Sequence, residues 1–174
     1  HTLAFGASGY LYVGGDFTTI GGQTRNYIAR FSTSDGSLST FNPNANAAVY
    51  ALTSDGTNIY TGGNFTSILR QARSKIALLD QNGELHSWAP VFNNTIRAFY
   101  LHDDILYVGG YFTTVDGTTR NRLAAFDLED GSLTSWDPSA NNTVFAITGD
   151  DDSIYVAGDF SSVGGQTRCK IAEL

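Results

Sequence analysis

The chain has 174 residues, of which 41% are hydrophobic and 13% aromatic, which is enough apolar material for one domain with a core. Its net charge of −7, with Lys75 and Lys170 as the only lysines, argues against a protein that binds the nucleic-acid backbone. It has no run of eighteen apolar residues, so we expect no membrane span.

A unit of 47 to 48 residues recurs along the chain. It opens with an apolar run (VYAL, IRAF, VFAI), continues with a second run (YVGG, YTGG, YVGG, YVAG) and a third (IARF, IALL, LAAF, IAEL), and closes with a fourth that leads to FNP, WAP or WDP. Val, Ile, Tyr, Phe and Trp dominate these runs, as strands prefer, and no stretch shows sustained helical periodicity. Each unit therefore predicts four short strands.

Four strands in a repeat of this length are typical of a β-propeller blade. The sequence predicts an all-β fold, a β-propeller of about four repeats, with four antiparallel strands per blade and a last blade that lacks its outer strand. We expect the first run to be innermost and the fourth outermost. The predicted blades of this single repeat domain or propeller segment are 1–48, 49–95, 96–143 and the incomplete 144–174.

The glycines recur because each blade needs them. The pair in YVGG allows a bulge and a close approach between blades. GGQTR leads into a strand, whereas a phosphate-binding loop ends in Gly-Lys-Ser/Thr and leads into a helix, so nucleotide binding is disfavoured. The second repeat reads SILRQAR where the others carry glycine, and we expect a different loop conformation there.

Aromatic residues at equivalent positions predict the core. We expect the phenylalanines after the second run to be buried and the aromatics of the fourth run to lie at the outer strand. The first set is Phe17, Phe65, Phe112 and Phe160, and the second is Phe41, Trp88 and Trp136.

The single cysteine is predicted to lie at the surface. Cys169 aligns with Asn26, Ser74 and Asn121, which are all polar, so we expect an exposed thiol.

The stretch RNYIARFSTSDGSLSTFNPNANAAVYALTSDGTNIYTGGNFTSI, residues 25–68, resembles the delta-60 repeat β-propellers. Their unit runs through the boxes iARl, DGslD..FnP, VyAL and iyvGGdFt, and the likeness covers nearly four units. A similar unit occurs in the fungal cortical-marker propellers. The resemblance implies an extracellular or surface-attached propeller, often one module of a longer protein, and it carries no catalytic signature.

Two polar or aromatic features are candidates for ligand contact. Tyr111 stands where the other repeats carry the polar residues Asp16, Asn64 and Asp159, so we expect its ring to be exposed. An exposed aromatic ring is suited to binding a glycan. An arginine recurs once per repeat and could ring an anionic ligand, although exact repetition favours bonds to turn carbonyls or carboxylates. These arginines are Arg25, Arg73, Arg120 and Arg168.

Metal and modification sites have weaker signals. The acidic turn 127–131 resembles half a calcium loop, but the matching turns of other repeats do not share it, so we expect no cofactor. His1, His86 and His102 fall at unrelated places in the repeat and predict no shared metal site. Candidate glycosylation sequons begin at Asn64, Asn93 and Asn141, with an Asn-rich turn as the alternative for the last two.

Two function classes remain open. The first is a non-enzymatic extracellular or surface module, structural or adhesive, that binds protein or glycan through blade loops. The second is a catalytic propeller, a hydrolase or lyase, that uses the central funnel. Propellers host both, but short, similar loops favour the first class.

The last repeat also bears on partners. Leu174 aligns with the end of a third run, so the fourth repeat lacks a counterpart of 127–143, which carries the outer strand. An unpaired strand edge invites pairing with another chain. We expect further blades of a longer chain, or a homo-oligomer, to complete the ring.

Overall fold

The computed structural model describes residues 1–174, apart from the side chain of Ser8. Strands dominate, and one short 3-10 helix, η1 (Ala7–Gly9), joins the first two. Within the described part of the chain, no helix has the length and apolar character needed to cross a bilayer. The chain forms two compact units, unit 1 (residues 1–90) and unit 2 (residues 91–174).

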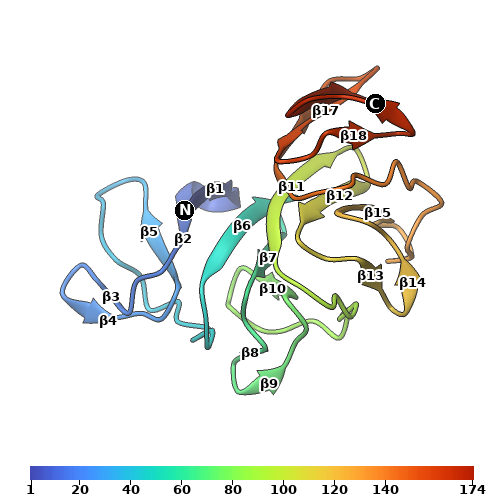
Figure 1. Ribbon diagram of the computed structural model, residues 1–174. Helices are drawn as coiled ribbons and strands as arrows, with labels where there is room; N and C mark the ends of the chain where they lie inside the picture. The colour runs from blue at the N-terminus through green and yellow to red at the C-terminus, as the bar shows by residue number, and fades with distance from the viewer. The chain divides into compact units, whose positions relative to one another are not determined.

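Each repeat folds into an antiparallel three-stranded sheet whose second run is the central strand (Figure 1). The sheets of unit 1 are β1 (Thr2–Gly6), β2 (Tyr10–Gly14) and β5 (Ile28–Ser32), and β6 (Val49–Ser54), β7 (Asn58–Gly63) and β10 (Ile76–Asp80). Those of unit 2 are β11 (Ile96–His102), β12 (Ile105–Gly110) and β15 (Leu123–Asp127), and β16 (Val144–Gly149), β17 (Ile154–Gly158) and β20 (Ile171–Glu173). We call these four sheets, with their loops, blades 1 to 4.

The fourth run of the first three repeats is shorter than a full strand. It pairs with the third strand through one bridge, at Leu38 in blade 1, Leu85 in blade 2 and Leu133 in blade 3. The aromatic residue three positions later instead packs edge-on against the tyrosine of the second strand. The ring centroids are 5.2 Å apart for Tyr12–Phe41, 6.0 Å for Tyr60–Trp88 and 5.1 Å for Tyr107–Trp136.

A small hairpin follows the second strand of every blade, and the apolar pattern of the sequence does not distinguish it from the third run. Figure 1 shows the two hairpins of unit 1 extending from their sheets. The hairpins are β3 (Thr19–Ile20) with β4 (Gln23–Thr24), β8 (Ser67–Ile68) with β9 (Gln71–Ala72), β13 (Thr114–Val115) with β14 (Thr118–Thr119), and β18 (Ser162–Val163) with β19 (Gln166–Thr167).

The turn of each hairpin needs two residues with positive φ. Gly21 and Gly22 supply φ angles of 58° and 73°, as expected for a two-residue type I′ turn. Leu69 and Arg70 adopt the same conformation, with φ angles of 50° and 61°. The expectation of a different loop in the second repeat is therefore wrong. The Leu69 amide donates to the Pro43 carbonyl at 2.7 Å, which helps to hold this turn without glycine.

Replacing Arg70 by glycine should stabilise the protein, because a left-handed backbone is strained in any residue with a Cβ atom. We expect a gain of about 0.5 to 1 kcal/mol in the free energy of unfolding, after allowing for the entropy of an unfolded glycine. Gly165→Ala is the matched control, since φ is 72° there and no atom lies within 4 Å of the added Cβ. Urea denaturation should show opposite shifts, and a destabilised Arg70→Gly variant would contradict this turn geometry.

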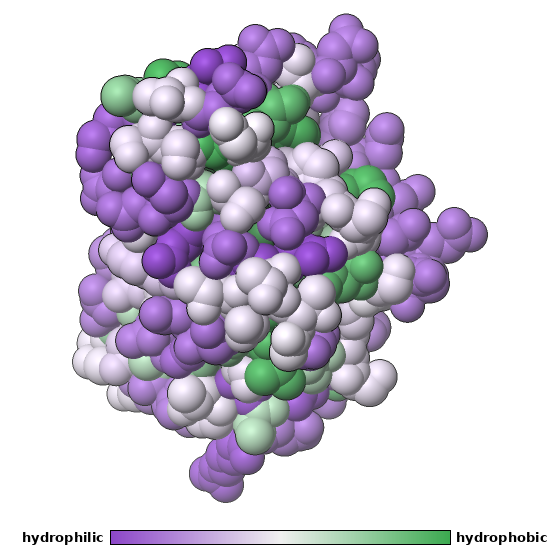
Figure 2. Space-filling model, turned by 45° about the vertical axis from the view of Figure 1, so that its right-hand side comes forward, coloured by the Kyte–Doolittle hydropathy of each residue, from purple (hydrophilic) through white to green (hydrophobic). Residues whose placement is uncertain are grey.

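The predicted core is confirmed in three blades. Phe65, Phe112 and Phe160 are fully buried, whereas Phe17 is only half-buried. The expectation for Phe17 is therefore wrong. Phe65 belongs to an apolar cluster that includes the loop residue Ala45, whereas Phe17 is not part of that cluster. Outside the core, most of the face drawn in Figure 2 is hydrophilic, with small separate apolar patches.

Candidate functional site

Two positions of the repeat place side chains at the end of the blade where the first strand begins. One is the residue directly after the second strand, which is Tyr111 in blade 3. The other is the second residue of the first strand, which is Arg97 in blade 3 and Phe145 in blade 4. The second position carries a different residue type in every blade and the first is aromatic only in blade 3, whereas the surrounding apolar frame repeats.

A β-bulge explains how Arg97 and Phe145 are presented. The pairing of β11 with β12 skips from Ile96 to Ala98, and that of β16 with β17 skips from Val144 to Ala146. The residue left out of the ladder is Arg97 in one strand and Phe145 in the other. Bulges redirect side chains in this way and occur frequently next to functional sites.

Tyr111, Phe145 and Arg97 form one cluster within unit 2, which we call the aromatic cluster. The rings of Tyr111 and Phe145 meet at 73° with centroids 6.1 Å apart. The Arg97 guanidinium carbon lies 5.7 Å from the centre of the Phe145 ring, a cation–π arrangement. Tyr111 is 37% exposed and Phe145 38% exposed, so both rings remain open to a ligand.

The backbone around Tyr111 is held firmly. The Tyr111 amide donates to the Thr95 carbonyl at 2.8 Å. The Arg122 guanidinium donates to the Tyr111 carbonyl and, at 3.3 Å, to that of Phe112. Arg122 itself has a φ of 69°, and Tyr27, Lys75 and Lys170 share that left-handed conformation at the same place in the repeat. The aromatic cluster therefore rests on a rigid element, as a binding site requires.

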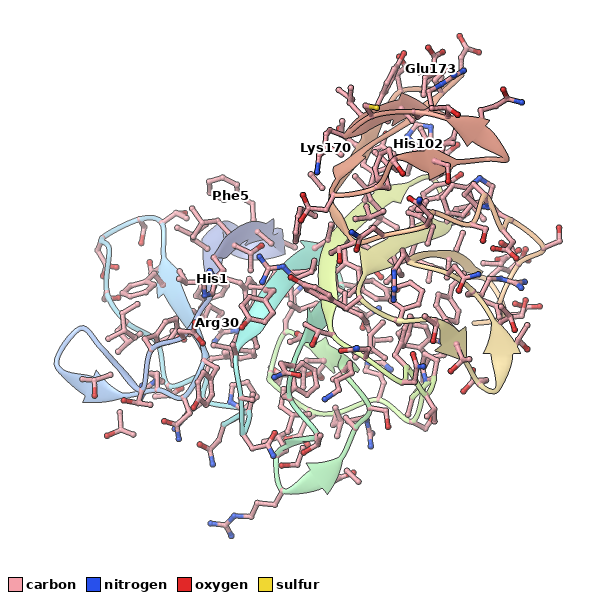
Figure 3. All side chains as sticks on the ribbon, in the orientation of Figure 1. His1, Phe5, Arg30, His102, Lys170 and Glu173 are labelled. Carbon is pink, nitrogen blue, oxygen red and sulfur yellow. The ribbon has the colours of Figure 1, made fainter. Side chains whose placement is uncertain are left out.

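Unit 1 has a different group of side chains at the equivalent positions. Asp16 takes the place of Tyr111, and its carboxylate lies 2.9 Å from His1 Nε2. The His1 ring packs against Tyr50, with centroids 4.8 Å apart (His1 is labelled in Figure 3). Tyr50 therefore packs against an imidazole that is paired with a carboxylate, whereas Phe145 packs against a phenol and a guanidinium.

The repeated arginines bind the backbone of their own blades. Each donates through Nη1 to the carbonyl of the preceding residue, and three also donate through Nη2 to the fourth run. The Nη2 acceptors are the carbonyls of Ser39 for Arg25, at 2.7 Å, of His86 for Arg73, at 2.8 Å, and of Thr134 for Arg120, at 2.7 Å. Arg168 donates to the Thr167 carbonyl and lines a pocket of about 440 Å³ beside Trp136 and Leu174.

Comparison with known proteins agrees with this architecture. A family model described as a domain of unknown function (DUF5122) β-propeller matches residues 7–41, 103–133 and 150–174, which together make up just over half of the chain. The chain belongs to this family. The match confirms the resemblance to repeat propellers and the all-β propeller fold.

One solved structure supports the fold independently. The crystal structure of the computationally designed Ika4 protein aligns with 99% of this chain and 88% of its own, with a TM-score of 0.64 and 14% sequence identity. At that identity the likeness concerns the fold alone. No curated protein matches the chain.

Asn93 and Asn141 join the loops before blades 3 and 4 to the small hairpins of these blades through hydrogen bonds. The side-chain Oδ1 of Asn93 accepts from the Thr113 and Thr114 amides, and its Nδ2 donates to Thr113 Oγ1 at 2.8 Å. Asn141 makes the same three bonds to residues 161 and 162, and Asn46, which is not in a sequon, makes them to residues 66 and 67. A glycan on Asn93 or Asn141 would have to share a nitrogen that already donates.

The other sequence-predicted sites are dispersed. Asn64 accepts a bond from Lys75 Nζ, and Cys169 is exposed as expected. In the acidic turn, hydrogen bonds from the Ser132 side chain and amide hold the pKa of Asp130 below its usual range. Among the described residues, no three His, Cys, Asp or Glu side chains gather as metal ligands.

Proposed function

We propose that this propeller is a non-enzymatic module, located outside the cell or at its surface, that binds a glycan through the aromatic cluster. The observation that carries the proposal is the half-exposed Tyr111–Phe145 pair with the Arg97 guanidinium beside it. Aromatic rings offer apolar area that keeps its shape, and the C–H face of a pyranose packs against such rings. A guanidinium offers several donors in a fixed geometry to sugar hydroxyls or a carboxylate.

The same chemistry favours binding over catalysis. An arginine side chain donates hydrogen bonds but has no acceptor atom, and a tyrosine hydroxyl is a weak base. Phe145 has no proton to exchange. These three groups can position a ligand, but they do not supply a general base that works near neutral pH. A hydrolase and lyase panel that gave clear turnover would contradict this part of the proposal.

Tyr111→Asn tests the site with little risk to the fold, because it installs the residue that blade 2 carries as Asn64. A glycan array should identify ligands of the wild-type chain. For such a ligand we expect the variant to lose affinity about tenfold, the equivalent of one aromatic contact of about 1.4 kcal/mol. The melting temperature should stay unchanged.

Val91→Ala is the control, since it removes an exposed apolar side chain that is not part of the aromatic cluster. It should leave binding intact. Array signals that survive Tyr111→Asn at full strength would show that the ligand binds elsewhere. A wild-type chain that binds no glycan but captures a protein through Tyr111 would favour the protein ligand over the glycan.

The proposed location outside the cell or at its surface rests on the resemblance to surface propellers. Protease treatment of intact source cells should remove the protein if it lies at the surface. Protection until the cells are broken would contradict an extracellular location.

A further inference from the structure

Blade 1 exposes an apolar sheet face. Leu3 is opposite Val13 in the β1–β2 ladder, and Phe5 is opposite Leu11, so these four side chains share one side of the sheet. Leu3 is 64% exposed and Phe5 75% exposed. Figure 3 shows the Phe5 ring projecting away from β1.

The equivalent face of blade 4 shows what such a surface contacts. The pairs at the same register are Ile147 with Val156 and Gly149 with Ile154, and all three apolar side chains are buried. They share a cluster with Leu123 and Ala98 of blade 3. This face of a blade therefore docks on the neighbouring blade, and in blade 1 it has the same chemistry but is open.

Blade 4 exposes the complementary face. Ala146, Ala157 and Ile171 form one row across its three strands. In blade 3 the same row consists of Ala98, Gly109 and Leu123, on which blade 4 packs. Leu123 is fully buried, whereas Ile171 is 66% exposed.

We infer that two copies of this chain associate head to tail, with the Leu3–Phe5 face of one copy docked on the Ile171 face of the other. The second copy is the occupant that the structure favours, because every chain carries both halves of this interface. The contact would repeat the one that blade 4 makes with blade 3. Such an interface is heterologous, since the two copies contribute different surfaces.

The test replaces one residue on each face by lysine and measures mass by light scattering over a concentration series. We expect the wild-type mass to rise to about twice that of the monomer or more. Leu3→Lys and Ile171→Lys should each remain monomeric. Val91→Lys, at an exposed residue that belongs to neither face, should associate like wild type. Because lysine reduces the net charge of −7, repulsion between copies cannot explain a loss of association.

Mixing the two variants distinguishes a heterologous interface from a symmetric one. Leu3→Lys keeps an intact Ile171 face and Ile171→Lys keeps an intact Leu3 face, so the mixture should associate although neither variant does alone. Circular dichroism checks folding, and Leu3→Ser replaces Leu3→Lys if the lysine variant unfolds. A wild-type chain that stays monomeric at every concentration, or a mixture that fails to associate, would overturn the inference.

Discussion

Phe65→Ala is expected to destabilise the protein by about 3 to 5 kcal/mol, because it leaves a cavity in a core that cannot fully collapse. Phe65 is fully buried in the apolar cluster of unit 1, together with Ala45, Val49 and Ile68. The melting temperature should fall by about 10 °C or more. Differential scanning calorimetry provides the measurement.

Phe17→Ala is the matched control, since Phe17 has the same place in blade 1 but is only half-buried. Less apolar surface returns to water when its ring is removed, so the loss should be at most about half that of Phe65→Ala. Equal losses for the two variants would contradict the burial difference between blades 1 and 2.

Gly63→Ala is the second substitution with a large expected effect. A Cβ at Gly63 would lie 2.1 Å from the Ala48 carbonyl oxygen and 3.0 Å from the Val49 Cα atom. That carbonyl is held in place because it accepts the Asn64 amide at 2.9 Å. Since backbone atoms must move, we expect a loss of about 3 kcal/mol in a urea denaturation series.

Gly15→Ala separates this clash from the general effect of adding a methyl group. Gly15 has the same place in blade 1, and its Cβ would approach the Phe17 ring at 3.1 Å and the His1 nitrogen at 3.6 Å. A half-buried ring can shift, so the cost should be clearly smaller. If Gly63→Ala proved as mild as Gly15→Ala, the close packing of Gly63 against the Ala48 carbonyl would be wrong.

The repeat made most of the fold predictable. Each apolar run occurs four times in the same order, so a mistaken assignment in one repeat would conflict with the others. The expected close approach between blades is confirmed at the first glycine of the pair. A Cβ at Gly14 would lie 2.6 Å from Val49 Cγ1, and one at Gly109 would lie 2.8 Å from Val144 Cγ1.

The hairpin turn at Leu69 and Arg70 could not be predicted from local preference. Leucine and arginine disfavour positive φ, so a reading based on propensity assigns them another conformation. Leu69 is partly buried against the core of unit 1, and its amide bonds to Pro43. These contacts, which the sequence does not reveal, outweigh the local strain.

The candidate site was predictable only in part. Tyr111 departs from the repeat at a position where the other blades are polar, and this departure is visible in the sequence. Phe145 lies in an apolar run, and this pattern predicts a core residue. Arg97 reads as a solvent-facing strand residue. In the structure both are left out of their strand ladders at bulges, Phe145 packs against Tyr111 and Arg97 lies over the Phe145 ring, and strand alternation does not reveal these contacts.

The most direct test of the proposed function is a two-dimensional NMR titration of the labelled chain with a sugar selected on the array. We predict that the largest shifts occur at the Arg97 Nε–H signal and at the amides of Tyr111 and Phe145. Signals of Tyr50, at the position equivalent to Phe145, and of His1, whose ring packs against Tyr50, should stay still. Shifts confined to His1 and Tyr50, or no shifts at Arg97 and Tyr111 on saturation, would contradict the account.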